Sequence, residues 1–401
     1  MFDTPINERH ARIDWILVVA LLGLMAVGTA FIYSAASTQD GAGQLAWYQQ
    51  FHVKQLVWYS IGLSFAVIIA VFDYHVLSRW AMIAYWVAIL LLILVLIPGI
   101  GKVIFGARRW IDLGFFNLQP SEFAKLAFLA ANAHFLSRPR DELRSPGNFW
   151  KSLGLAALPM ALIIKEPDLG SALIFIPMSL GMLFIAGAPT RFLAKLVGVA
   201  AVFVSVMVIH TLFAPPQLQI IEEYQRKRLL VYFGADFAPR GASDEVRRQK
   251  QREQRQYSYN VEQAMISVGS GGLLGKGWCQ GTQNALGYLP RAVAHNDFIF
   301  SVIAEEKGFI GSVFVVTLYS AILFSGIRIA GQARDRLGKL LAGGVVIMLF
   351  SHVFINIGMN IRIMPVTGVP LPLLSYGGSS VVCALIAVGI LQNVHLHRRA
   401  Y

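Results

Sequence analysis

The stretch RWAMIAYWVAILLLILVLIPG, residues 79–99, decides the fold class, because no charged side chain follows Arg79 within it. A run of about 20 apolar residues is long enough to cross the hydrocarbon core of a bilayer as a helix. Lipid offers no partner for backbone amides, so such a run satisfies them internally by forming a helix. The segment therefore predicts a membrane-spanning helix.

The composition of the whole chain indicates several such helices. Of the 401 residues, 56 % are hydrophobic and 14 % are charged, whereas a soluble protein has about 25 % charged residues. A water-soluble fold of this size cannot bury so much apolar surface, and a disordered chain is far less hydrophobic. We therefore predict an all-α polytopic membrane protein with about ten transmembrane helices, forming a single membrane domain over residues 1–401.

The spans and their orientation follow from apolar runs and loop charges. With the N-terminus inside, the inside segments hold fifteen Lys and Arg residues and the short outside loops hold six, which predicts both termini in the cytoplasm. The first run is too long for a cleavable signal peptide. The predicted spans are 14–35, 53–72, 79–99, 119–137, 150–166, 168–188, 191–214, 307–330, 338–361 and 377–396, and proline at 167 separates the fifth from the sixth.

Charge and cysteine content exclude other classes of protein. The net charge of +12 fits basic loops beside anionic lipid head groups. No basic stretch is interleaved with stacking aromatic residues, so we expect no nucleic-acid partner. Cys279 lies in a polar loop and Cys383 in an apolar run, so no disulfide is expected, and no zinc-binding spacing is present.

Two outside loops are unusual. The loop 100–118 carries Arg108 and Arg109 on the side where positive charge is disfavoured, so these residues bind either lipid phosphate or a specific anion. The loop 215–296 is too long for a simple connector. Its charged middle, 244–255, predicts a solvated surface helix, and its glycine-rich part near Lys276 resembles a tight loop whose amides approach a phosphate.

Charged and polar residues inside the spans are candidates for function, because they are costly there. Glu122 and Lys125 lie three residues apart on one helix face and are expected to form an ion pair, either structural or supporting the site. His352, Asn356 and Asn360 recur every four residues and form one polar stripe. The stripe either joins helices or lines a groove for a substrate head group.

Carboxylates gather at the outer ends of two spans. Asp168 follows Pro167, and Asp297 precedes an apolar run, so each is placed to cap a helix. Capping does not account for Glu305 and Glu306. Three carboxylates within ten residues suit a base that acts on a substrate arriving from the bilayer.

Seven short motifs occur along the chain, namely IYSA at 32–35, GARRW at 106–110, QPSEFAK at 119–125, EPDLGSAL at 166–173, SGGLLGKG at 270–277, HNDFIF at 295–300 and MPVTGVPLPLLSYGGSS at 364–380. In this order they resemble one family, the SEDS proteins (shape, elongation, division and sporulation), over nearly the whole chain. Thr367, where division-type members usually have Lys, makes the chain most similar to the elongation type. Three features depart from the family pattern: Arg291 with a longer segment before Asp297, Arg362 in place of a small residue, and the pair Trp278-Cys279.

The resemblance implies a peptidoglycan glycosyltransferase that polymerises lipid II, an undecaprenyl-pyrophosphate-linked disaccharide peptide. It implies a site at the outer face of the bacterial cytoplasmic (inner) membrane, work in cell elongation and rod shape, and a class B penicillin-binding protein as partner. It places the catalytic carboxylate at Asp297, and we expect Ser375, in the last motif, to contact substrate.

The chemistry itself requires a base and cations. A carboxylate can take the proton of an acceptor hydroxyl, and cations stabilise the pyrophosphate that leaves. Arg108, Arg109 and Lys276 are on the correct side of the membrane for this purpose. A divalent cation, Mg or Mn, would serve the same end, although no dedicated cage is evident in the sequence. The alternatives are a lipid II flippase or other transporter and a non-catalytic scaffold for the synthase partner.

Overall fold

The computed structural model describes residues 13–37, 46–104, 107–114, 116–138, 146–213, 223–238, 243–289 and 293–398. Every predicted span contains a helix. These helices are α1 Trp15–Ser37, α2 Phe51–Val71, α4 Ala81–Leu96, α5 Pro120–Leu136, α7 Pro146–Lys165, α8 Leu169–Ala186, α9 Thr190–Phe213, α13 Ile299–Gln332, α14 Arg336–Asn360 and α15 Gly378–His397. Among the described residues, eight helices are long and apolar enough to cross a membrane; α4 with 16 residues and α5 with 17 are shorter.

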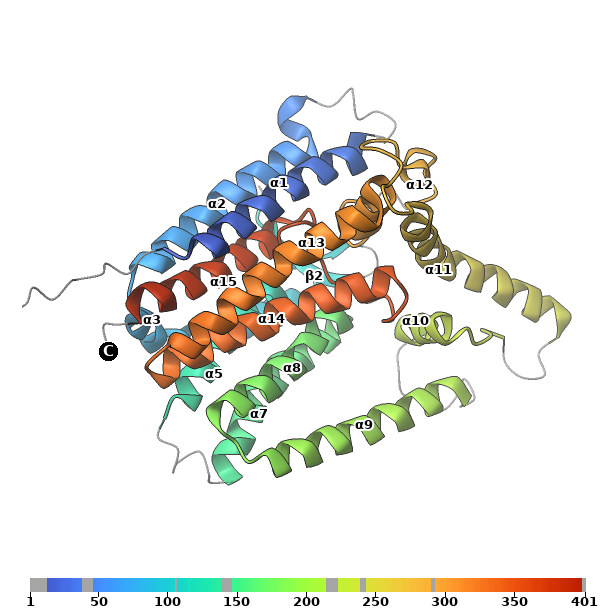
Figure 1. The fold of residues 1–401 in the computed structure, drawn as a ribbon. Coiled ribbons are helices and arrows are strands. Elements are labelled where there is room, and N and C mark those ends of the chain that lie inside the picture. The colour runs from blue at the N-terminus through green and yellow to red at the C-terminus, as the bar shows by residue number, and fades with distance from the viewer. Residues whose placement is uncertain are drawn as a thin grey trace, which may run out of the picture.

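The helices form a bundle in which segments distant in sequence are neighbours (Figure 1). Helix α15 packs on α2, α13 lies between α1 and α14, and α8 contacts both α7 and α14. Helix α9 lies apart from most of the bundle in Figure 1, and it contacts α8 and α10, its neighbours in the chain. The helices outside the predicted spans are η2 Trp47–Gln49, α3 Tyr74–Arg79, α10 Glu223–Phe233, α11 Asp244–Ser270 and α12 Thr282–Ala285.

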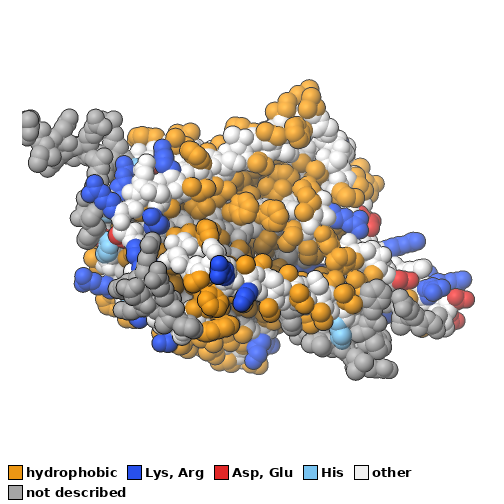
Figure 2. Space-filling view, turned by 60° about the horizontal axis from the view of Figure 1, so that its bottom comes forward, with side chains coloured by type: hydrophobic (Ala, Val, Ile, Leu, Met, Phe, Trp, Pro, Cys, Tyr) orange, Lys and Arg blue, Asp and Glu red, His pale blue; other side chains and the backbone are white. Residues whose placement is uncertain are grey.

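Apolar side chains cover the outside of the bundle and polar ones lie within it. Val67 on α2 and Val199 on α9 are 61 % and 67 % exposed, whereas Glu122 and Lys125 on α5 are 3 % and 1 % exposed. Figure 2 shows a hydrophobic flank, with Lys and Arg gathered mainly toward its two ends. This arrangement is the one expected of a bundle surrounded by lipid, and the chain is a multi-pass membrane protein.

The loop 100–118 folds into a small antiparallel sheet that the sequence did not predict. Strands β1 Gly101–Ile104, β2 Ala107–Asp112 and β3 Asn117–Leu118 pair in the order β1-β2-β3. Short strands next to a longer helical pattern give only a weak periodic signal. The fold is thus a helical membrane bundle with one three-stranded sheet.

Helix α13 is longer than predicted and has a kink. It begins at Ile299 rather than at 307, and Gly308 within it has a left-handed φ of +64°. The glycine-rich segment lies against this kink: the amides of Phe309 and Ile310 donate to the carbonyls of Gly272 and Leu273 at 2.9 and 3.2 Å. A side chain at Gly275, whose φ is +81°, would collide with the backbone of Glu306, so only glycine allows this contact.

Candidate active site

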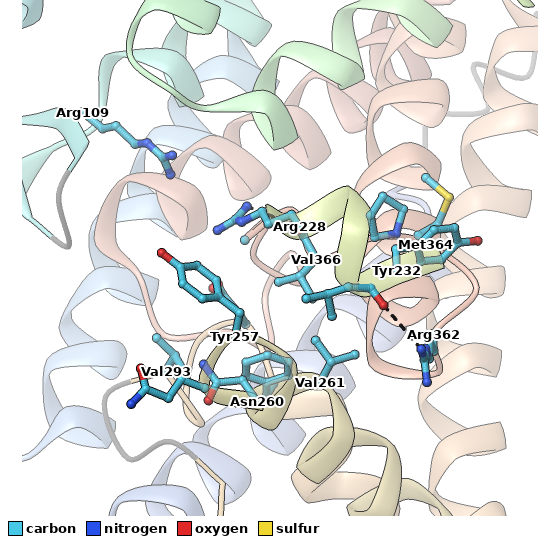
Figure 3. A pocket seen from close by; sticks show the side chains of 16 residues that line it. Arg109, Arg228, Tyr232, Tyr257, Asn260, Val261, Val293, Arg362, Met364 and Val366 are labelled. Atoms are coloured by element: carbon cyan, nitrogen blue, oxygen red, sulfur yellow. Dashed lines mark hydrogen bonds between the residues drawn. The ribbon is translucent and has the colours of Figure 1, made fainter. Parts of the chain in front are cut away.

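A cavity of about 400 Å³ opens where α10, α11 and the segment after α14 meet the start of α13 (Figure 3). It is lined by both polar and apolar side chains, and Asp297 is the acidic residue among them. A cavity of this size with a few converging polar groups is typical of a ligand site. Its lining is Arg109, Arg228, Val231, Tyr232, Gln256, Tyr257, Asn260, Val261, Val293, Asp297, Phe298, Arg362, Met364, Pro365, Val366 and Gly368.

Asp297 lies in a turn rather than at a helix cap. Its amide donates to the Val293 carbonyl at 3.0 Å. The residue at the N-cap of α13 is Phe298, and no side chain caps this helix. The capping interpretation of Asp297 is therefore wrong. Within the part of the chain that the structure describes, no hydrogen bond reaches its carboxylate, which leaves the carboxylate available to a bound molecule.

The surroundings of Asp297 favour a base that works near neutral pH. Burial raises the pKa of Asp297 from 3.8 to about 6; the charges of Arg228 and Arg109 oppose this rise and Asp168 adds to it. Burial disfavours the ionised form, and nearby guanidinium groups favour it. A pKa of about 6 is matched to proton abstraction at neutral pH, because the group is mostly ionised yet still basic.

The polar stripe on α14 holds the Asp297 turn in place. The Asn356 side chain donates to the carbonyls of Asp297 and Val369 at 3.0 and 2.7 Å. The Asn360 side chain donates to the Asp297 carbonyl at 3.2 Å and accepts from Ser301 at 2.6 Å. Both residues are fully buried and neither lines the cavity. Periodicity correctly placed them on one face, and their partners outside α14 are two backbone carbonyls and the Ser301 hydroxyl, which favours the joining of helices over a groove for a substrate head group.

Ser375 is a second support of the same turn. Its hydroxyl donates to the Asn296 carbonyl at 2.5 Å and accepts from the Leu371 amide at 2.8 Å. One residue further, the Tyr376 amide donates to the His295 carbonyl at 2.9 Å. Ser375 does not line the cavity, so these bonds replace the substrate contact expected of it. The last motif thus acts as a clamp on the turn that carries Asp297.

The two neighbouring arginines of β2 point in different directions. Arg109 lines the cavity and donates to the carbonyls of Glu166, at 3.1 Å, and Pro167. Arg108 instead donates to the Leu96 carbonyl at the end of α4, at 3.2 Å. Successive side chains of a strand face opposite sides. The structure therefore corrects the expectation that both arginines bind substrate: only Arg109 faces the cavity.

Sequence reasoning missed most of the cavity wall. Arg228 on α10 lines the cavity and donates to the Val366 carbonyl at 3.0 Å, and Gln256, Tyr257 and Asn260 come from α11. The first half of α11 is exposed, as predicted for 244–255, but its second half turns into the cavity. The available signal was the change along this helix from charged residues to tyrosine, asparagine and apolar residues after 256.

Lys276 and Glu305 bind each other rather than the cavity. The Lys276 ammonium is 2.6 Å from a Glu305 carboxylate oxygen, and that oxygen also accepts from Thr282 and from the Gln283 amide.

Glu306 accepts from Ser34 and from the Cys279 amide. The amides of Lys276 and Gly277 donate to the carbonyls of Glu305 and Glu306 at 3.0 Å. The three carboxylates are thus not one site, and this loop does not offer its amides to a phosphate as expected.

The predicted ion pair within the bundle is present. The Lys125 ammonium lies 2.7 Å from a Glu122 carboxylate oxygen and 2.9 Å from His352 Nε2. All three side chains are buried, and none lines the cavity that contains Asp297. His352 therefore joins α14 to α5, which is the helix-linking alternative for the stripe rather than the groove.

The turn between α7 and α8 places two more carboxylates near Arg109. Asp168 caps α8 through the Ser171 amide at 3.1 Å, as predicted, and lies 4.0 Å from the Arg109 guanidinium. Glu166 is buried, and in the described residues neither of its carboxylate oxygens has a hydrogen-bond partner. Burial and the Asp168 charge raise the pKa of Glu166 to about 9, against the opposing charge of Arg109.

Among the described residues, no group of three His, Cys, Asp or Glu side chains is arranged to hold a metal ion. Residues 290–292, which contain the departure at Arg291, lie outside the described residues, as do 105–106 before Ala107.

Comparison with known proteins gives consistent matches over the full chain. The family model FTSW_RODA_SPOVE, described as cell cycle protein, matches residues 14–400. The chain is 35 % identical to peptidoglycan glycosyltransferase MrdB of Escherichia coli K12, covering 100 % of this chain and 98 % of that protein. It is 30 % identical to peptidoglycan glycosyltransferase RodA of Treponema pallidum, over 95 % and 97 %.

A solved structure described as "Structural coordination of polymerization and crosslinking by a peptidoglycan synthase complex" contains a similar chain. The TM-score is 0.74 at 29 % sequence identity, over 97 % of this chain and 99 % of that one. The similarity in fold therefore extends over the helices that form the cavity.

Proposed function

The chain belongs to the FtsW/RodA/SpoVE family of cell cycle proteins, and we propose that it polymerises lipid II into glycan strands with Asp297 as the general base. It is a peptidoglycan glycosyltransferase, like its relatives of that name. One observation carries the assignment of the base: a carboxylate without a hydrogen-bond partner among the described residues lies in a cavity with two arginines, whose charges favour its ionised form.

The reaction follows from this arrangement. The acceptor hydroxyl gives its proton to the Asp297 carboxylate while its oxygen bonds to the anomeric carbon of the donor sugar. The bond from that carbon to the pyrophosphate oxygen breaks, and the lipid pyrophosphate leaves. Arg109 and Arg228 stabilise the charge that grows on the leaving group, because guanidinium forks bind phosphate oxygens in pairs. A pKa of about 6 keeps Asp297 ionised and ready at neutral pH.

The test compares polymerisation with transport. The purified chain, alone and with its crosslinking partner, receives fluorescent lipid II, and products are separated on a gel. We expect polymer from the wild type and a loss of about 10²–10⁴ in rate from Asp297→Asn. Asp244→Asn, an exposed carboxylate of α11, is the matched control and should leave the rate unchanged. Normal polymer from Asp297→Asn refutes the base. Dye-quenching transport in liposomes without polymer supports the flippase, and the lack of both supports the scaffold.

The partner and the membrane are proposed on the same basis. The similar solved chain comes from a synthase complex that couples polymerisation to crosslinking, which supports a class B penicillin-binding protein as partner here. We place the chain in the bacterial cytoplasmic membrane, with both termini inside and the cavity outside, and assign it to cell elongation. Cysteines introduced at two exposed positions, Arg334 between α13 and α14 and Trp278, test the orientation with a membrane-impermeant reagent. Only Trp278→Cys should react from outside, with Cys279 replaced in both variants and the buried Cys383 kept.

A divalent cation, Mg or Mn, stays a proposal. It would be carried by the substrate pyrophosphate, because such cations keep several waters and often bind through phosphates. Initial polymerisation rates with and without EDTA test this proposal. If EDTA leaves the rate unchanged, no metal ion is needed, and the arginines alone balance the charge of the pyrophosphate.

A further inference from the structure

We propose that Arg362 forms a second oxyanion-binding subsite in the cavity, separate from the reacting centre at Asp297. It takes a carboxylate or phosphate group on a distant part of the substrate. The proposal rests on the proposed function and deepens it, because it names a residue that binds substrate away from the chemistry.

Arg362 lies where two cavities meet. It is the residue after the C-cap of α14, and it lines both the cavity that contains Asp297 and an adjoining cavity of about 100 Å³. The smaller cavity has a mixed wall, in which Gln254, Ser258 and Glu262 of α11 are the polar residues besides Arg362. Among the described residues, the Arg362 side chain makes one hydrogen bond, a donation to the Val231 carbonyl of α10 at 3.4 Å, and the residue is otherwise exposed. The guanidinium group is therefore accessible to a bound molecule at the junction of the two cavities.

The backbone conformation at Arg362 is energetically unfavourable for any residue that has a side chain. Its φ is +59°, a left-handed conformation that is uncommon for residues other than glycine. The position is the one after the C-cap Ile361, where glycine is the usual residue. Left-handed residues of this kind persist where the surroundings fix them, and they cluster at ligand sites. A glycine would complete the same turn without this cost, so the turn itself does not require the arginine.

The subsite is distinct from the arginines beside the base. In Figure 3, Arg109 and Arg362 lie on opposite sides of the pocket, with Arg228 between them. The charges that act on Asp297 are those of Arg228, Arg109 and Asp168, and Arg362 is not among them. Arg109 and Arg228 are therefore placed for the pyrophosphate at the reacting carbon. Arg362 is placed for an oxyanion further away.

Each lipid-linked disaccharide peptide carries two kinds of oxyanion, and a planar guanidinium fork binds either of them. One is the carboxylate of the stem peptide. The other is a pyrophosphate. The reaction joins two lipid-linked units next to Asp297, so the second substrate molecule brings a pyrophosphate besides the one that leaves. Both share the chemistry that Arg362 provides, and the experiment distinguishes them.

The experiment measures initial rates of the full chain with its partner across lipid II concentrations. We expect Arg362→Gln and Arg362→Gly to raise KM about tenfold, equivalent to about 1.4 kcal/mol, with kcat within about twofold. Arg362→Lys should show a smaller rise, because Lys keeps the charge but not the fork. Arg248→Gln, on the exposed part of α11, controls for general charge near the membrane and should match the wild type.

Two further measurements identify the oxyanion that Arg362 binds. If it is the peptide carboxylate, the KM difference between wild type and Arg362→Gln disappears with a lipid II analogue that lacks the stem peptide. If it is a pyrophosphate, the difference persists, and undecaprenyl pyrophosphate inhibits the Gln variant about tenfold less well. Either result supports the subsite.

Two results overturn it. One is an unchanged KM for Arg362→Gln with both substrates. The other is a raised KM for Arg362→Gln together with a normal KM for Arg362→Gly. In that case the effect would come from placing a glutamine side chain on a residue with positive φ, and the loss of the positive charge would have no effect. Failure of the proposed function looks different, because then the wild type makes no polymer or Asp297→Asn remains active.

Discussion

Replacing Asp297 by Asn should stabilise the protein while it abolishes activity. The pKa of Asp297 is raised from 3.8 to about 6 because the folded protein surrounds it. At 1.36 kcal/mol per pH unit, this rise means that the ionised carboxylate costs the folded state up to about 3 kcal/mol. Asn carries no charge and has no hydrogen-bond partner to lose, since no bond to the carboxylate exists among the described residues. We therefore expect a gain of about 1–3 kcal/mol at pH 7.5.

The sign of the pH dependence gives a sharper test than the gain itself. A raised carboxylate pKa means that the cost appears as pH rises through 3.8, grows until about 6 and then stays constant. At pH 5 the cost is only about 1.6 kcal/mol, so Asn should help less there than at pH 7.5. Thermal unfolding of the purified protein in detergent, at both pH values, measures the two differences. Asp244→Asn again serves as control.

Two results would refute this reasoning. If Asp297→Asn is no more stable than the wild type at pH 7.5, the carboxylate is not held in a costly environment. If the gain is equal at pH 5 and 7.5, its cause is packing rather than ionisation. The same titration should lower the polymerisation rate of the wild type below about pH 6, because protonation removes the base.

Three other predictions follow from contacts in the structure. Glu122→Ala and Lys125→Ala should each cost about 3–5 kcal/mol in stability, and the double variant less than their sum; additive losses in a double-mutant cycle would mean that the 2.7 Å pair is not coupled. Arg109→Lys should lower kcat several-fold at normal abundance because Lys lacks the fork, whereas Arg108→Lys, away from the cavity, should lose less; equal rates for both in polymerisation assays would remove Arg109 from phosphate handling. Gly275→Ala should cost more than about 2 kcal/mol, since φ is +81° and the new methyl group meets the Glu306 backbone; an unchanged melting temperature would contradict that contact.

The features that the sequence predicted well depend on local rules. The lengths of the apolar runs correctly predicted where the helices lie, and proline at 167 correctly predicted the break between α7 and α8. The Glu122–Lys125 pair and the Asp168 cap need only residues three apart on one helix, and both are present. Asp297 was singled out by its motif, and the structure adds its position in the cavity.

The features that the sequence did not predict depend on which helices, strands and loops contact one another in the folded protein. The stripe on α14 was correctly placed on one face, but periodicity cannot tell whether that face meets a ligand or the carbonyl of Asp297. Arg108 and Arg109 looked alike because β2 was not predicted, and only a strand separates them to opposite sides. Arg228 was missed because its helix reaches the cavity from another part of the chain.

The clamp on the Asp297 turn has a consequence for how the protein is made. Ser375 and the Asn296 carbonyl that it binds are 79 residues apart in sequence, and Asn356 and Asn360 also follow Asp297 in the chain. At a synthesis rate of about 5–20 residues per second, the turn leaves the ribosome about 4–16 s before the groups that hold it. A chain released early therefore carries its base in an unfixed loop. Synthesis of the last motif and insertion of the helices around it are what make the enzyme competent, so an incomplete copy in the membrane stays inert.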